Sequence, residues 1–98
     1  MLVRIVKLKF RAECIADFQA HFEAHKDLIR NFPGCQYLKV LQQQDDPTVW
    51  MTYSHWDNEN ALNNYRDSEL FGGVWKQTKQ WFGDKPQAWS MNERYILP

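Results

Sequence analysis

The sequence of 98 residues lacks a long hydrophobic run, an excess of charge of either sign, and an abundance of cysteine. A membrane-spanning helix needs roughly 20 mostly apolar residues in a row, and no segment approaches that length. Near the start, Arg4, Lys7 and Lys9 interrupt the apolar residues, unlike the apolar centre of a signal peptide. We therefore expect a cytoplasmic protein with no membrane partner.

The charge balance argues against two further classes of partner. The chain has 12 Lys and Arg against 12 Asp and Glu, and its pI is about 6.8. A nucleic-acid reader would show a basic face, so we expect no nucleic acid and no binding to acidic lipid. The two cysteines, Cys14 and Cys35, permit a disulfide, but in a cytosolic protein they are more often free thiols. Cys14 near a helix start is either inert or, alternatively, reactive.

Aromatic residues are abundant, with 5 Trp, 4 Tyr and 6 Phe. The densest stretch, residues 48–56, is β-branched and aromatic, which is typical of a strand. The period of two gives this strand two opposed rows. One row is Trp50, Thr52, Ser54 and Trp56, and the other is Val49, Met51, Tyr53 and His55. Because both rows carry large apolar groups, we expect a central strand covered on both faces.

The rest of the chain divides into alternating strand and helix patterns. The three remaining strands are predicted at 2–10, 35–43 and 88–97. An amphipathic helix is predicted at 13–32, with the apolar stripe Ile15, Phe18, Phe22, Leu28, Ile29 and Phe32. A short helix to about Arg66 begins at Asp57 or Asn58, and Ser68 caps a further helix that reaches Phe82. The turn at Asp45-Asp46-Pro47 predicts an antiparallel hairpin between the second and third strands.

The element order is β-α-β-β-α-β within a single domain, 1–98. This order predicts an α+β, ferredoxin-like fold, in which one antiparallel sheet carries its helices on one face. The second face of the sheet, with residues such as Met51 and Tyr53, then needs another cover. A second copy of the chain is the simplest cover, so we predict a homodimer.

Four segments of the sequence resemble the antibiotic biosynthesis monooxygenase family of dimeric α/β barrels. They are the opening strand at 3–7, Phe-Pro-Gly-Cys at 32–35, Tyr-Ser-His-Trp at 53–56 leading into Glu-Asn-Ala-Leu at 59–62, and Tyr-Arg-Asp-Ser-Glu-Leu-Phe at 65–71. The resemblance implies a reaction with molecular oxygen that uses no metal or flavin cofactor. The substrate would be a small quinol-like or polyphenolic aromatic, which becomes its own electron donor once deprotonated.

The resemblance also implies a set of site residues. The substrate-binding candidates are Trp50, Thr52 and Trp56 from the sheet, with Phe71 and Trp75 from the helical half. Tyr65 is a catalytic candidate, but its phenol titrates near 10 and would rather orient a substrate hydroxyl. Apart from the resemblance, His55 is a candidate base because imidazole can accept a proton near neutral pH, or it only forms hydrogen bonds at the predicted dimer face. Each aromatic residue also has a plainer interpretation as core packing. A non-catalytic dimeric module that binds an aromatic metabolite is therefore the alternative function.

The chain departs from the family at several of these positions. Where members that oxidise polycyclic aromatics have Asn, Trp and Tyr, this chain has Thr52, Trp56 and Leu62. Quinol-oxidising members often have a His at the position of Tyr65. Haem-degrading members use an Asn, a Trp and a His where this chain has Lys7, Tyr65 and Trp75, so we do not expect haem degradation.

Two local features complete the prediction. His21 and His25 are four residues apart on one side of a helix, a spacing that can hold a metal, but no third ligand is evident and we expect no metal. Gly72 and Gly73 fall inside a predicted helix, where each costs about 0.8–1 kcal/mol relative to Ala. They leave room for a ligand or for close backbone approach, or they reflect a later helix start or a tolerated weakness.

Overall fold

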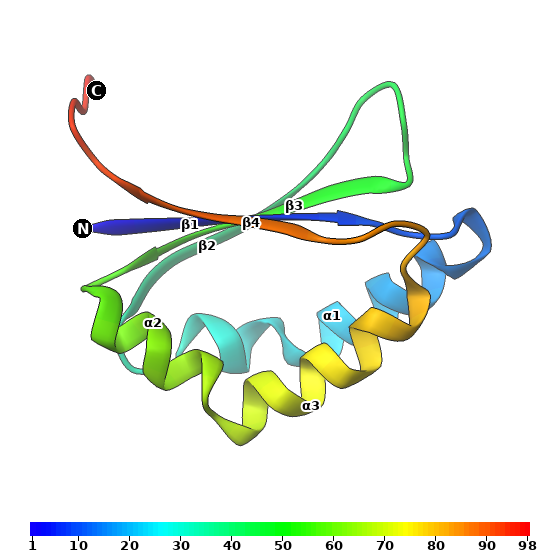
Figure 1. The fold of residues 1–98 in the computed structure, drawn as a ribbon, viewed down its shortest axis with the longest axis horizontal. Coiled ribbons are helices and arrows are strands. Elements are labelled where there is room, and N and C mark those ends of the chain that lie inside the picture. Colours follow the sequence, from blue (N-terminus) through cyan, green and yellow to red (C-terminus); the bar gives the residue numbers. More distant parts are fainter.

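The structure, a computed structural model, describes all residues 1–98 as one antiparallel sheet with its helices on one face (Figure 1). The strands are β1 (Leu2–Lys9), β2 (Cys35–Gln42), β3 (Val49–Trp56) and β4 (Gln87–Asn92). The helices are α1 (Ile15–Arg30), α2 (Glu59–Arg66) and α3 (Glu69–Thr78), with 3₁₀ turns at Ala12–Cys14 and Lys79–Trp81. This confirms the ferredoxin-like α+β fold. The sheet is open within one chain, and none of the helices has the length and apolar character needed to cross a bilayer.

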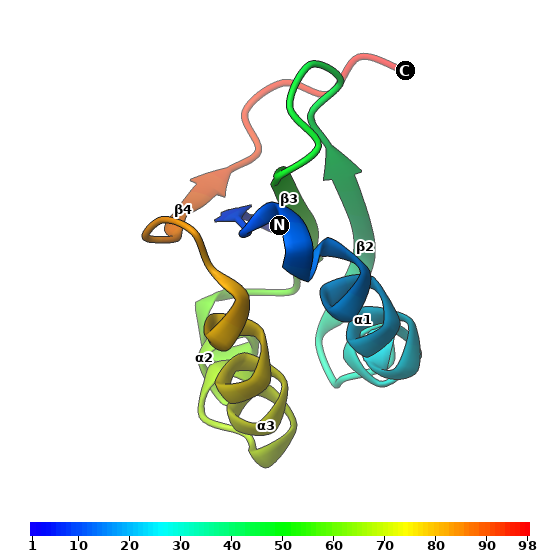
Figure 2. The ribbon, with the colours of Figure 1, turned by 90° about the vertical axis from the view of Figure 1, so that its right-hand side faces the viewer.

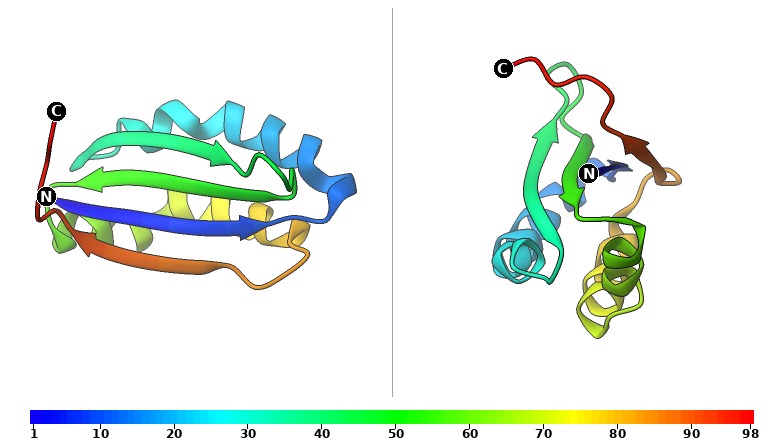
Figure 3. Two further views of the ribbon diagram at one scale, coloured as in Figure 1. Left: turned by 90° about the horizontal axis from the view of Figure 1, so that it is seen from above. Right: turned by 90° about the vertical axis from the view of Figure 1, so that its left-hand side faces the viewer.

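The strand order across the sheet is β2-β3-β1-β4, with every pair antiparallel (Figure 3). β1 and β3 are the central strands, in register from Leu2 opposite Trp56 to Lys9 opposite Val49. The predicted hairpin of β2 and β3 is confirmed, with a register shift between Cys35 and Tyr37. The central position of β3 agrees with its apolar residues on both faces.

Side-chain caps determine where the second and third helices begin. The Asn58 side chain accepts a hydrogen bond from the backbone N–H of Ala61 at 2.9 Å, so Asn58 and not Asp57 caps α2. The Ser68 hydroxyl accepts from the N–H of Phe71 at 3.1 Å and caps α3, as the sequence predicts. Both side chains satisfy a donor that the first helical turn leaves unpaired.

The helix layer covers only one face of the sheet, and α1 and α3 run side by side beneath it (Figure 2). Even-numbered residues of β1 and β3 face this layer. The apolar core gathers in two clusters. The first cluster is built on Leu8, Phe10 and Phe18, and the second is built on Cys35, Trp56 and Leu62.

Three predicted element ends are wrong. α1 ends at Arg30, and Leu28, assigned to the apolar stripe, is 58% exposed. α3 ends at Thr78, where the chain tightens into a 3₁₀ turn before Phe82. β4 ends at Asn92 instead of Leu97, because Asn92 pairs with Leu2 and β1 extends no further.

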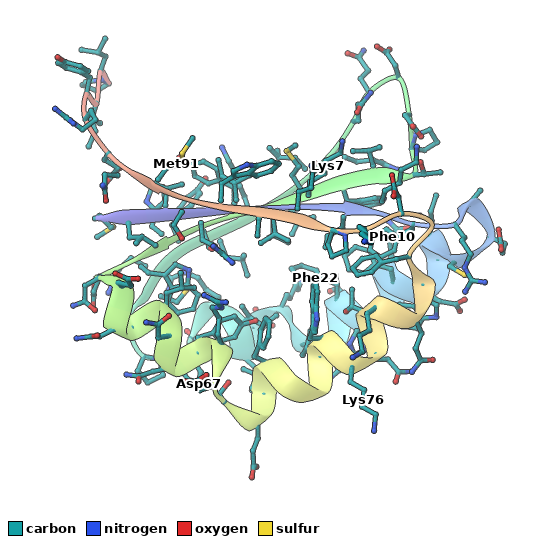
Figure 4. All side chains as sticks on the ribbon, in the orientation of Figure 1. Lys7, Phe10, Phe22, Asp67, Lys76 and Met91 are labelled. Carbon is teal, nitrogen blue, oxygen red and sulfur yellow. The ribbon has the colours of Figure 1, made fainter.

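The sheet face opposite the helices carries large side chains and no covering element. Figure 4 shows Lys7 and Met91 on this open face, with Phe22 on the helical side of the sheet. Four large apolar side chains there are about half exposed: Tyr37, Leu41, Trp89 and Met91. The Nζ atom of Lys39 lies 4.8 Å from the centre of the Tyr53 ring. On the same face, the Nε2 atom of His55 is buried without a hydrogen-bond partner.

Candidate functional site

A cavity of about 530 Å³ lies between the sheet and the helices, bordered by residues of both core clusters. The side-chain sizes along β3 explain it, because bulky Trp50 and Trp56 stand near the two ends and small Thr52 and Ser54 stand between them. On the edge strand, Ala88 adds another small side chain to the cavity wall. The volume is typical of small-molecule sites, which span roughly 300–1,000 Å³.

Aromatic rings form a continuous wall that runs from Trp56 on β3 along the helices α2 and α3. Tyr65 stacks on Trp56 with ring centres 4.9 Å apart, and Phe71 meets the Tyr65 ring edge-on at 5.2 Å. Trp75 then lies nearly parallel to Phe71 at 5.8 Å. All four side chains line the cavity. Such a wall suits a flat aromatic ligand, because offset and edge-on ring contacts add to the burial of apolar area.

Trp56 is fixed in place by the strand that carries it. Its side chain is 1% exposed, and its indole N–H donates to the Ser54 hydroxyl at 2.9 Å. The Ser54 hydroxyl in turn donates to the backbone carbonyl of Arg4 at 3.5 Å. The indole plane at one end of the cavity is therefore held by a buried hydrogen-bond chain.

Tyr65 remains a neutral phenol at ordinary pH. Burial strongly raises the pKa of its hydroxyl, and the neighbouring Cys35 thiolate would raise it further. A phenol with a raised pKa is a poor proton acceptor at neutral pH. Tyr65 can still donate a hydrogen bond or accept one from a bound ligand.

The structure brings together five of the seven site residues predicted from sequence, and Thr52, Trp56, Tyr65, Phe71 and Trp75 all line the cavity. Trp50 does not line it. Its ring packs edge-on against Phe18 at 5.6 Å, and its indole N–H donates to the Pro47 carbonyl at 3.0 Å. Trp50 thus belongs to the first core cluster.

His55, the base candidate from sequence, lies on the open face of the sheet and does not line the cavity. Side chains alternate along β3, so His55 points away from Ser54 and Trp56. Its ring lies 5.0 Å from Tyr37 and 5.2 Å from Tyr53, two residues of the open face. A sheet backbone therefore separates His55 from the cavity.

Charged residues of the cavity are absent from the sequence prediction. Arg4, Arg66 and Asp67 all line it. Arg4 is half-buried on β1, and its Nη1 donates to the Ser90 hydroxyl at 3.0 Å. Burial lowers the pKa of the Arg4 guanidinium, and the nearby Arg66 charge lowers it further. The sequence signal that could have identified Arg4 is the alternation of side chains along β1, which places Arg4 on the same face as Val6 and Leu8.

His21 also lines the cavity, from α1. Its Nε2 lies 3.2 Å from the Val74 carbonyl oxygen, and because a carbonyl only accepts, Nε2 carries a proton and, in the neutral ring, Nδ1 has the lone pair. The His25 ring is 4.5 Å away, with its Nδ1 donating to the His21 carbonyl at 2.7 Å. No group of three or more metal-binding side chains occurs in the chain.

Three further residues singled out in the sequence, Lys7, Gly72 and Gly73, lie outside the cavity. Lys7 points from the open face (Figure 4), away from Tyr65 and Trp75. Gly72 and Gly73 are exposed positions inside α3, and a Cβ atom added to either would meet nothing within 4 Å. Close backbone approach and a later helix start are therefore both wrong for these glycines. Neither glycine lines the cavity, so they make no room for a ligand there, and a tolerated weakness of the helix remains.

The fold defines a small α+β protein with an aromatic-lined cavity between the sheet and the helices. The chain belongs to the antibiotic biosynthesis monooxygenase family, whose model matches residues 1–76. A search of curated proteins gave no match.

Solved structures share the fold over almost the whole chain. An antibiotic biosynthesis monooxygenase superposes with a TM-score of 0.91 at 18% identity, covering 97% of this chain and 100% of that one. A conserved protein from Methanosarcina mazei Go1 has a TM-score of 0.89 at 16% identity, with 96% and 94% covered. A variant of SnoaB, a cofactor-independent oxygenase from Streptomyces nogalater, has a TM-score of 0.88 at 13% identity, with 99% and 96% covered.

Proposed function

We propose that the protein is a cofactor-independent monooxygenase that oxidises a small quinol-like or polyphenolic aromatic with molecular oxygen. The observation that carries this proposal is the aromatic-walled cavity in a chain of the monooxygenase family. The structural likeness to SnoaB, described as a cofactor-independent oxygenase, supports the same class of reaction. A ring held between the Trp56–Trp75 wall and Thr52 would be shielded from bulk water, which limits side reactions of reactive intermediates.

The reaction needs no electron carrier, because the substrate supplies the electrons. In the balanced reaction, a quinol and O₂ give a hydroxyquinone and one water. One oxygen atom forms the new C–O bond, and the other leaves as water with two hydrogens of the substrate. The protein has to bind the ring, accept a phenolic proton and exclude water.

His21 is the cavity side chain best suited to accept that proton. A neutral imidazole can act as a general base through its unprotonated nitrogen, which in His21 is Nδ1, because Nε2 donates to the Val74 carbonyl. Tyr65 would orient a substrate hydroxyl as a neutral phenol, since burial raises its pKa. We therefore favour His21 over His55, which the sheet separates from the cavity.

Oxygen uptake by the purified, metal-stripped protein tests this proposal. A panel of hydroquinones and naphthohydroquinones would be supplied, and products would be checked for one atom of labelled oxygen. We expect protein-dependent uptake that His21→Gln reduces by about 10²–10⁴-fold, the usual contribution of a general base. His55→Gln, the same substitution on the other side of the sheet, is the matched control and should retain activity. Uptake no faster than autoxidation with every substrate, or equal loss in both variants, would contradict the proposal.

A non-catalytic module that binds an aromatic metabolite is the second candidate. The observations that favour it are Thr52 and Leu62 at positions that carry Asn and Tyr in related oxygenases, together with a tyrosine whose raised pKa rules it out as a base. This candidate predicts thermal stabilisation by one of the same aromatics, because a ligand that binds only the folded state raises its stability. It also predicts no uptake of oxygen.

We further propose that the protein is a homodimer that pairs through the open face of the sheet. Tyr37, Leu41, Trp89 and Met91 there are 41–52% exposed, an unusual cluster for one face of a small monomer. A second copy of the chain would cover this face, sheet against sheet. Side chains of that copy would then surround the Nε2 atom of His55, which has no hydrogen-bond partner within one chain.

Light scattering at micromolar concentration tests the dimer. We expect twice the chain mass for the wild type and the single mass for the double variant Leu41→Lys with Met91→Lys. Leu28→Lys is the control, because Leu28 is an exposed apolar residue on α1, away from the open face. A strictly monomeric wild type would contradict this proposal.

A further inference from the structure

The cavity presents two guanidinium groups and no counter-ion for them. Arg4 projects from β1 and Arg66 from the last turn of α2, and both line the cavity. The four ion pairs of the chain involve Met1, Lys9, Arg11 and Lys26, so neither cavity arginine is paired. Asp67 is the one carboxylate among the lining residues, and it forms no ion pair with either guanidinium.

Arg66 has a structural explanation that Arg4 lacks. A cation in the last turn of a helix interacts favourably with the helix dipole, and Arg66 is also exposed. Arg4 stands in the middle of the sheet on the row that carries Val6 and Leu8, half-buried beneath the helix layer. Its one side-chain partner is the neutral Ser90 hydroxyl at 3.0 Å, which orients the guanidinium without neutralising it.

The electrostatics of this arrangement favour an anion. A half-buried charge costs free energy unless it is paired, and the second positive charge of Arg66 adds repulsion. An anionic group bound at Arg4 would relieve both effects. A carboxylate fits best, because the planar guanidinium fork offers it two parallel N–H donors. An un-ionised phenol, which titrates near 10, would leave the charge unpaired at neutral pH.

We propose that the cavity takes an aromatic carboxylate, with its ring against the Trp56–Trp75 wall and its carboxylate on Arg4. The inference rests on the proposed function in one respect, that this cavity is the substrate site. It narrows the substrate class from any quinol-like aromatic to hydroxylated aromatic acids. Arg66 supports the anion from the mouth of the site as a second, more exposed charge.

Calorimetric binding of two matched ring compounds, 2-naphthoate and neutral 2-naphthol, at pH 7 tests the inference without any chemical step. A hydrogen-bonded charge contributes about 1.5–3 kcal/mol, so naphthoate should bind the wild type roughly 10–100-fold more tightly than naphthol. Arg4→Met should remove this preference and leave naphthol binding unchanged. Arg4→Lys should retain part of it, and Arg66→Met should weaken naphthoate binding less than Arg4→Met.

Lys76→Met is the matched control. It removes the same charge from α3, but Lys76 is exposed and points away from the sheet (Figure 4). The inference would be overturned if the wild type bound the two compounds with equal affinity. It would also be overturned if Arg4→Met weakened the binding of naphthoate and of naphthol by the same factor. If Arg4→Met does not fold, Arg4→Lys and Arg66→Met still decide it. Selective naphthoate binding without oxygen uptake from hydroxylated aromatic acids would uphold this inference and reject the oxygenase.

Discussion

Replacing Gly72 and Gly73 by alanine should stabilise the protein without affecting its ligand site. Both glycines lie inside α3, both are exposed, and an added Cβ atom meets nothing within 4 Å at either position. Glycine in a helix interior costs about 0.8–1 kcal/mol relative to alanine, so the double variant should gain roughly 1.6–2 kcal/mol. Much of the gain arises because alanine restricts the unfolded chain. For a domain of this size the expected rise in Tm is about 10 °C.

Urea unfolding and thermal denaturation measure this gain, and Gly34→Ala provides the contrast. Gly34 has a φ of +88°, and a Cβ atom there would overlap the Cβ of Ala61. The same chemical change should therefore destabilise the protein at Gly34 by at least the 1–2 kcal/mol that a left-handed conformation costs a residue with a side chain. If the double alanine variant is less stable than the wild type, or binds aromatics more weakly, then Gly72 and Gly73 provide space that the structure does not reveal and the reasoning is refuted.

Two further predictions concern the cavity wall. Ser54→Ala leaves the buried indole N–H of Trp56 without its acceptor, so it should lower the free energy of unfolding in urea by about 1–3 kcal/mol. In a Trp56→Phe background, which has no indole N–H, the same change should cost nearly nothing. Equal costs in the two backgrounds would mean that the hydrogen bond is not the cause. Because burial raises the pKa of Tyr65 in the folded state, its contribution to stability is complete below pH 10 and is lost as the pH rises beyond it. The free energy of unfolding should therefore fall more steeply above pH 10 in the wild type than in Tyr65→Phe, and parallel curves would contradict the burial of this phenol.

Sequence periodicity predicts most of the fold because burial repeats with the geometry of each element. The alternation along β3 separates Ser54 and Trp56 from His55, and the structure confirms both rows. Ser68 is recognisable as a cap because its hydroxyl pairs with a local donor three residues on. Such local signals need no knowledge of the tertiary structure.

Pairing with a neighbouring strand decides where β4 ends, which the residue pattern of the sequence does not. Apolar residues recur after Asn92 at Tyr95, Ile96 and Leu97, but a strand needs a partner, and β1 begins at Leu2, which pairs with Asn92. Leu97 is accordingly 91% exposed.

The candidate site was predicted only in part, for a related reason. Its aromatic residues are recognisable by type, whereas the sequence shows Arg4 only as a charge that interrupts an apolar strand and His21 only as one of a histidine pair. Their proximity in the cavity depends on how α1 packs across β1, which no local pattern encodes. The sequence places His55 on the open face and also makes it a candidate base. Only the position of the cavity, on the opposite face of the sheet, shows that His55 cannot reach a ligand there.

The central claim is that aromatic ligands bind between the sheet and the helices, and fluorine NMR tests it most directly. The chain has 5 Trp, and 5-fluorotryptophan labelling gives each one a resonance that a Trp→Phe variant can assign. Added 1,4-naphthohydroquinone, kept under nitrogen, should shift the signals of Trp56 and Trp75, which line the cavity, and leave Trp89 on the open face unchanged. A shift of Trp89 with Trp56 and Trp75 unmoved would place the ligand on the other side of the sheet and contradict the account.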